Sequence, residues 1–174
     1  ILQEATPLGH LKAGNALFAR GQVLHPRQDV GRRLEVAKGQ HPIAVIVSCS
    51  DSRVPPEVVF DQGLGDVFVV RAAGNVVDEQ GLGSIEYAVE HLHAHLIVVL
   101  GHDQCGAVKA AVAGGEAPGH IGSVVGAIEP AVAKARQEAG DLLAHAVDEN
   151  VRRVVEQIRT SEPILAPEVK AGAL

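Results

Sequence analysis

Three residues that can hold a soft metal ion fall in two short stretches of the sequence. Cys49 lies in CSDSRV, whereas His102 and Cys105 lie in HLHAHLIVVLGHDQCGAV, which spans 91–108. Thiolate and imidazole are borderline-soft ligands, and zinc is the usual metal in such a set. Three protein ligands leave one tetrahedral position for water, which is the arrangement of a catalytic zinc site rather than a structural one.

The residue types alone leave other interpretations open. The two cysteines also fit the role of small buried hydrophobic residues, or of a redox pair. Asp51 and Arg53 stand close to Cys49 and can pair at the mouth of a site, but the same spacing suits a surface ion pair of little energetic value. The predicted strands and helices, which set where these residues lie, are therefore needed to choose between the alternatives.

Continuous β-branched apolar runs predict three strands, over 43–48, 66–71 and 96–101. Runs without polar alternation are typical of strands buried on both faces, as in a parallel sheet. Strands that alternate with helices predict an α/β fold, with a parallel sheet flanked by helices on both faces. The sequence predicts helices over 7–20, 32–40, 54–61, 79–93, 105–113, 121–138 and 144–159.

This architecture would bring the candidate ligands together. Cys49 directly follows the first predicted strand, His102 directly follows the third, and Cys105 opens the next helix. The carboxyl ends of parallel strands share one edge of the sheet, and ligands of open α/β sheets bind at that edge. Three other histidines precede the third strand at its opposite end and are expected to be solvated rather than metal-bound: His91, His93 and His95.

Composition narrows the class of protein. A chain of 174 residues that is 47% apolar is long enough for one domain with a hydrophobic core. We expect a single domain over 1–174, with an N-terminal helical arm over about 1–38 and a zinc-binding α/β core over about 39–174. The net charge of −6, without a Lys/Arg cluster, excludes a nucleic-acid footprint, and no apolar run approaches a membrane span. Two distant cysteines and no signal-peptide pattern favour a reducing, cytoplasmic setting.

The sequence resembles the β-class carbonic anhydrases in CSDSRV, GDVFVVRAAGN, SIEYAV and VVLGHDQCGAV, within a similarity that extends from about Leu8 to Leu174. The combination Cys-x-Asp-x-Arg and His-x-x-Cys at this separation is highly specific. The resemblance implies one Zn²⁺ per chain, bound by Cys49, His102 and Cys105. It also implies a carbonate dehydratase, a zinc lyase that converts CO₂ reversibly to bicarbonate and a proton by attack of zinc-bound hydroxide.

The same resemblance implies roles for five further residues. Arg53 would hold Asp51 away from the metal, and Asp51 would accept a hydrogen bond from the hydroxide; these two are the predicted catalytic residues. The predicted substrate-binding residues are Gln40, Phe68 and Gly106. Gln40 also fits an ordinary loop position, and Phe68 fits core packing almost equally well.

Assembly and function leave further alternatives. The resemblance implies a homodimer or a higher even-numbered oligomer. Members of the family usually continue after VKAGAL with two further strands, so we expect either additional chain or another subunit at the edge of the third strand. Hydrolysis of CS₂ or COS on the same scaffold remains an alternative function. A non-catalytic zinc-binding subunit is a second alternative, although a structural site needs neither Asp51 nor Arg53.

Overall fold

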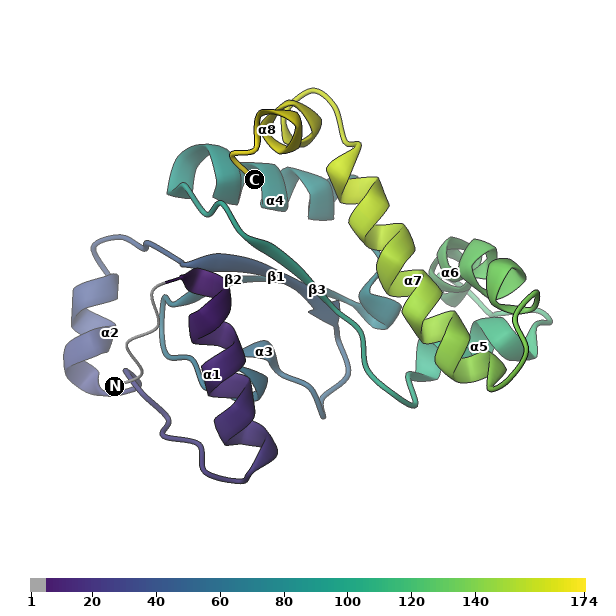
Figure 1. The fold of residues 1–174 in the computed structure, drawn as a ribbon, viewed down its shortest axis with the longest axis horizontal. Coiled ribbons are helices and arrows are strands. Elements are labelled where there is room, and N and C mark those ends of the chain that lie inside the picture. Colours follow the sequence, from purple (N-terminus) through teal and green to yellow (C-terminus); the bar gives the residue numbers. More distant parts are fainter. Residues whose placement is uncertain (1–5) are drawn as a thin grey trace.

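The structure, a computed structural model, describes residues 6–174 and contains a parallel sheet with helices on both faces (Figure 1). The strands are β1 (Ala44–Cys49), β2 (Val67–Ala72) and β3 (Ile97–Leu100), in the order β2-β1-β3. The predicted α/β class is therefore confirmed. The strand limits differ slightly from the prediction, because Cys49 is the last residue of β1 instead of the residue after it.

The helices follow the predicted order, but several have other bounds; the helix predicted over 54–61, for example, covers only Pro56–Val59. The second helix starts at Val30, because the Asp29 side chain caps it by accepting a hydrogen bond from Arg32 N, and it ends at Val36 instead of continuing to 40. A helix after 160 is present although none was predicted. The elements are α1 (Pro7–Ala19), α2 (Val30–Val36), α3 (Pro56–Val59), the 3₁₀ turn η1 (Ala73–Asn75), α4 (Glu79–Leu92), α5 (Gly106–Ala113), α6 (Ile121–Ala135), α7 (Leu142–Arg159) and α8 (Leu165–Ala171).

Each face of the sheet is covered by its own set of helices (Figure 1). On one face, Val45 and Val47 pack with residues of α4, the C-terminal part of α7 and α8. On the other face, Leu11 of α1 packs against Ala44 and Ile46. These strand residues are at most 1% exposed, which explains why β1 reads as an uninterrupted apolar run. Residues 1–5 of the predicted N-terminal arm lie outside the described residues.

A third apolar cluster lies beyond the carboxyl edge of the sheet, where α5, α6 and the N-terminal half of α7 pack together (Figure 1). Asp141 starts α7 by accepting hydrogen bonds from Leu143 N and Ala144 N. Cys49 and Cys105 belong to this cluster, together with Ile128 of α6 and further residues of the same three helices. The two candidate thiol ligands are therefore built into a hydrophobic core rather than placed on a loop surface.

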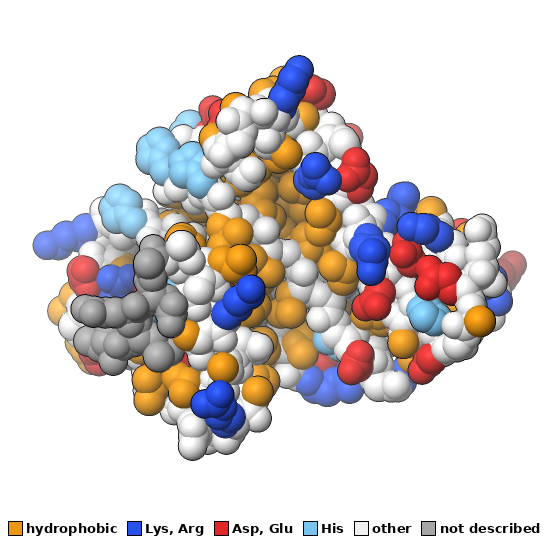
Figure 2. All heavy atoms as spheres, in the orientation of Figure 1, with side chains coloured by type: hydrophobic (Ala, Val, Ile, Leu, Met, Phe, Trp, Pro, Cys, Tyr) orange, Lys and Arg blue, Asp and Glu red, His pale blue; other side chains and the backbone are white. Residues whose placement is uncertain are grey.

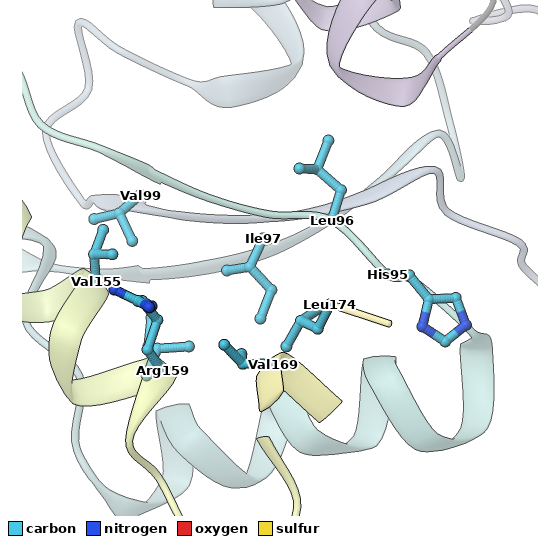
Figure 3. Close-up of a pocket in the computed structure, with 9 residues that line it drawn as sticks. His95, Leu96, Ile97, Val99, Val155, Arg159, Val169 and Leu174 are labelled. Carbon is cyan, nitrogen blue, oxygen red and sulfur yellow. The ribbon is translucent and has the colours of Figure 1, made fainter. Parts of the chain in front are cut away.

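The outer edge of β3 pairs with no other strand of the described residues. Hydrophobic side chains gather over this region in Figure 2, between α8 and α1. A cavity of about 220 Å³ lies there. It is lined mainly by apolar residues that include Ile97, Val99, Val169 and Leu174 (Figure 3). Among residues 6–174, no helix has both the length and the apolar character that crossing a membrane requires.

Candidate metal centre

Three side chains converge at the carboxyl edge of β1 and β3. Cys49 ends β1, His102 follows β3, and Cys105 is the residue before the first turn of α5. One ligand atom from each of the three lies within 4.8 Å of the other two, and the two sulfur atoms are 3.9 Å apart. The structure thus brings together the three predicted ligands, which are separated by up to 56 residues in the chain.

The donor atoms fit a soft divalent metal ion. Both cysteines are free and at most 4% exposed, and the His102 side chain is 8% exposed. The Nε2 atom of His102 is buried without a hydrogen-bond partner among the described residues, which is costly unless another group binds it. Its other ring nitrogen, Nδ1, lies 2.9 Å from the backbone oxygen of Asp103, a contact that orients the ring. Two sulfurs and one nitrogen are a typical zinc ligand set.

The environment of Cys49 favours its thiolate. The hydrogen bond with Cys105 is the largest cause that lowers the pKa of Cys49 to about 4, and nearby His102 also lowers it, whereas burial opposes the shift. Two backbone N–H groups point at the same sulfur, from Asp51 at 3.4 Å and from Gly74 at 3.2 Å. The bond with the Cys49 thiolate, followed by burial, raises the pKa of Cys105. The contact between the two sulfurs is therefore the main cause of both pKa shifts, which have opposite directions.

Asp51 and Arg53 form the predicted pair next to this cluster. The guanidinium donates from Nε to Asp51 Oδ1 at 2.8 Å and from Nη2 to Oδ2 at 2.7 Å. These bonds, and then the Arg53 backbone N–H, hold the pKa of Asp51 well below its usual range. Oδ2 of Asp51 lies 3.8 Å from Nε2 of His102, so the carboxylate borders the place where the three ligands converge.

Sequence reasoning missed the contacts that a second arginine, Arg71, makes in this region. Arg71 of β2 donates from Nε to the carbonyl of Cys49 at 2.8 Å and from Nη2 to the carbonyl of Asp51 at 2.6 Å. It therefore fixes the turn that carries both a ligand and the carboxylate. These contacts form because β2 lies beside β1, with Arg71 in register with Ser48. In the sequence, the only sign of this role is a charged residue near the end of an apolar run.

The other predicted residues lie at different places. Gly106 begins α5 directly after Cys105, and a side chain there would meet no atom within 4 Å, so its backbone is accessible. Gln40 is exposed and precedes β1, and Phe68 pairs with Val45 at the start of β2. Within one chain, these two residues therefore lie at the opposite end of the strands from Cys49. The three expected solvated histidines are exposed and lie outside the cluster: His91, His93 and His95.

The comparisons with known proteins agree on one family. The family model described as carbonic anhydrase matches residues 44–174. A carbonic anhydrase of Mycolicibacterium smegmatis is 45% identical over 166 residues, which cover 93% of this chain and 81% of the relative.

Solved structures show the same fold. The Coccomyxa β-carbonic anhydrase in complex with acetazolamide superposes with a TM-score of 0.74 at 29% identity, over 99% of this chain and 78% of that one. A chain from a study of two tetrameric β-carbonic anhydrases of Sordaria macrospora gives a TM-score of 0.73 at 25% identity, over 94% of this chain and 85% of that one. The chain described here belongs to the β-class carbonic anhydrase family.

Proposed function

We propose that this protein is a carbonate dehydratase that interconverts CO₂ and bicarbonate, with one Zn²⁺ per chain bound by Cys49, His102 and Cys105. One observation carries the proposal: a buried imidazole nitrogen, without a hydrogen-bond partner in residues 6–174, meets two thiols beside a carboxylate that an arginine already holds. A structural zinc site has no use for such a carboxylate, whereas a site that must orient a water molecule does. Membership of the carbonic anhydrase family supports the same reaction.

Zinc bound there would act as a Lewis acid that lowers the pKa of a coordinated water toward neutrality. The chain's own residues would orient that water. Asp51 is ionised and acts only as an acceptor, so it can take a hydrogen bond from the water and aim a lone pair at the carbon of CO₂. Arg53 keeps Asp51 in this role, because a bidentate pair fixes both its direction and its charge.

Gly106 supports binding of the anionic product. Its N–H belongs to the first turn of α5, where backbone donors and the helix dipole favour an anion. The open space around its Cα allows bicarbonate to approach the backbone. Gly106 would therefore stabilise the bicarbonate beside Cys105 before water replaces it.

Gln40 and Phe68 would act only across an interface. β1 contains six residues, so its two ends lie about 16 Å apart at the usual rise of a strand. A second copy of the chain would have to bring these side chains toward the metal centre. The tetrameric relatives of Sordaria macrospora support such an arrangement.

The proposed assembly is a homodimer or a higher even-numbered oligomer. Large apolar side chains of the N-terminal region are exposed in the isolated chain and would gain from burial against a partner: Leu8, Phe18, Leu24, Val30 and Leu34. Light scattering at micromolar concentration should give an even multiple of the 18.1 kDa chain mass, and a stable monomer would contradict the assembly.

We place the protein in the cytoplasm, since a reducing compartment keeps both ligand thiols free.

A panel of substrates tests the reaction. Zinc-loaded protein should hydrate CO₂ in a stopped-flow assay far above the buffer rate, with much slower turnover of COS and CS₂. All three molecules offer an electrophilic carbon, so the comparison separates carbonic anhydrase from the hydrolase alternative. Zinc-loaded protein that hydrates none of them would leave only a non-catalytic zinc-binding role.

A further inference from the structure

Asn150 is a buried amide of α7 that reaches the turn next to the metal centre. It is 1% exposed, and its Nδ2 donates to the carbonyl of Gly74 at 2.7 Å. Gly74 lies in η1, and its own N–H donates to the sulfur of Cys49 at 3.2 Å. Asn150 is therefore hydrogen-bonded to Gly74, which in turn donates to the candidate metal ligand Cys49.

The turn at η1 has a conformation that needs external support. Gly74 has a φ of 67°, and the next residue, Asn75, has a φ of 46°, which is uncommon for a residue with a side chain. A Cβ at Gly74 would lie 2.6 Å from Cδ1 of Ile128, so a side chain there would displace Ile128 and would also strain the backbone at this positive φ. Gly74 adopts this conformation freely, whereas Asn75 keeps it only when its surroundings fix it. The bond from Asn150 is the side-chain hydrogen bond that fixes the Gly74 carbonyl among the described residues.

The same segment of α7 also packs on the approach to His102. A Cβ at Gly101 would lie 2.5 Å from Cγ2 of Val151 and 3.5 Å from Cγ1 of Val147. Gly101 connects β3 to His102. α7 therefore touches the segments next to two of the three ligands, and Asn150 provides its polar contact.

We infer that Asn150 is a positioning residue of the metal centre, which holds Gly74 so that the Gly74 N–H stays on the sulfur of Cys49. The inference rests on the proposed function, because it concerns the same metal site. A hydrogen bond to a thiolate stabilises the filled sulfur orbitals and weakens electron donation to a bound metal. Losing it would make Cys49 a stronger donor and would loosen the turn that places it.

Cobalt substitution tests this directly, because thiolate-to-cobalt charge-transfer bands report on sulfur donation without any turnover. Asn150→Leu removes the donor at nearly constant volume, and Asn150→Asp puts a carboxylate against the Gly74 carbonyl. Both variants should shift the sulfur-to-cobalt band to lower energy. Both should also bind cobalt about tenfold more weakly in competition with a chelator, the lower end of the usual loss of metal affinity when a group that supports a ligand is removed.

Two controls separate this role from simple destabilisation. Gln62 is a matched amide, 2% exposed, which donates from Nε2 to the carbonyl of Phe60 at 2.7 Å. Gln62→Leu should lower the stability without moving the band. Val154→Ala loosens α7 at a residue that is 3% exposed and should likewise leave the band in place. Asn150→Ala, which removes the donor without adding bulk, is the second variant if the leucine variant does not fold.

An unchanged band in Asn150→Leu, or in Asn150→Ala if the leucine variant does not fold, would overturn the inference. An equal shift in Val154→Ala would also overturn it, because the effect would then come from helix packing. A parent protein without a sulfur-to-cobalt band would contradict the metal site and this inference together. Failure of CO₂ hydration in a parent that shows the band would contradict only the proposed reaction.

Discussion

Arg53 binds both carboxylate oxygens of Asp51, with bonds of 2.8 Å to Oδ1 and 2.7 Å to Oδ2. Arg53 also donates from Nη2 to the carbonyl of Gln104 at 3.3 Å, which links the pair to the segment between His102 and Cys105. The carboxylate is thus held at the border of the metal centre in a fixed orientation. A surface ion pair without a function would not need this third contact.

Arg53→Ala should therefore abolish most of the activity while zinc stays bound, since all three ligands remain. We expect CO₂ hydration to fall about 10²–10³-fold, the usual effect of losing one aligned polar group in an active site. The freed Asp51 should move to the cation, and a crystal structure of the zinc-loaded variant should show a carboxylate oxygen at about 2.0–2.2 Å from the metal.

The control for this experiment is Arg159→Ala, which breaks an exposed pair with Glu156 at 3.4 Å far from the site. It should keep normal turnover. Asp51→Asn should lose activity without closing the site, because a neutral amide is a poor zinc ligand. Near-normal hydration in Arg53→Ala would show that the pair has no part in the chemistry.

The ligand set can be checked by spectroscopy and substitution. X-ray absorption at the zinc edge should show two sulfurs and one nitrogen from the protein. Cys105→Ser should remove most of the zinc, whereas His93→Ala should remove none, because His93 is exposed and lies outside the cluster. Zinc loss in the His93 variant, or ligation by oxygen alone, would refute the assignment.

The thiols should make the stability of the metal-free protein depend on pH. The pKa of Cys49 is lowered to about 4 in the folded state, against about 8.5 for a free cysteine. Between these values the unfolded chain binds the extra proton, so Cys49 stabilises the fold fully above about pH 8.5 and loses this effect as the pH falls toward about 4.

Urea unfolding of the metal-free parent and of Cys49→Ser measures this effect. The difference between their free energies of unfolding should grow from about pH 5 to about pH 8. A constant difference over that range would mean that Cys49 is an ordinary buried thiol.

The face of the sheet covered by α4 should carry much of the stability. Ile85 of α4 is fully buried, and Ile85→Ala should lower the free energy of unfolding by about 2–5 kcal/mol. Ile121 is 56% exposed, and Ile121→Ala should change the free energy of unfolding by less than about 0.5 kcal/mol. Denaturant unfolding measures both variants. Equal losses of the free energy of unfolding would argue against this packing.

The sequence predicted the parts of the fold that depend on local pattern. The runs IAVIVS, DVFVVR and LIVVLG became β1, β2 and β3 because each is buried or partly buried on both faces. Cys49 and His102 could be paired in advance, since parallel strands end at one edge. α8 was missed because its seven residues include a proline and too few apolar positions to show a helical period.

The remaining features depend on contacts that no local pattern shows. Arg71 reaches two carbonyls because β2 lies beside β1, and the strand order cannot be read from the runs themselves. Asn150 looked like one polar residue among many in α7, and only the packing of that helix on Gly74 and Gly101 sets it apart. Gln40 and Phe68 remain predictions, because their roles need a second copy of the chain.

The central claim is that zinc held by Cys49, His102 and Cys105 makes this site catalytic. Titrating metal-free protein with zinc, while CO₂ hydration is followed by stopped flow, tests it most directly. The rate should rise in proportion to the zinc added, up to about one equivalent per chain as expected for a three-ligand catalytic site, and then stay constant. A fully zinc-loaded protein that hydrates CO₂ no faster than buffer, or a rate that does not depend on zinc, would contradict the account.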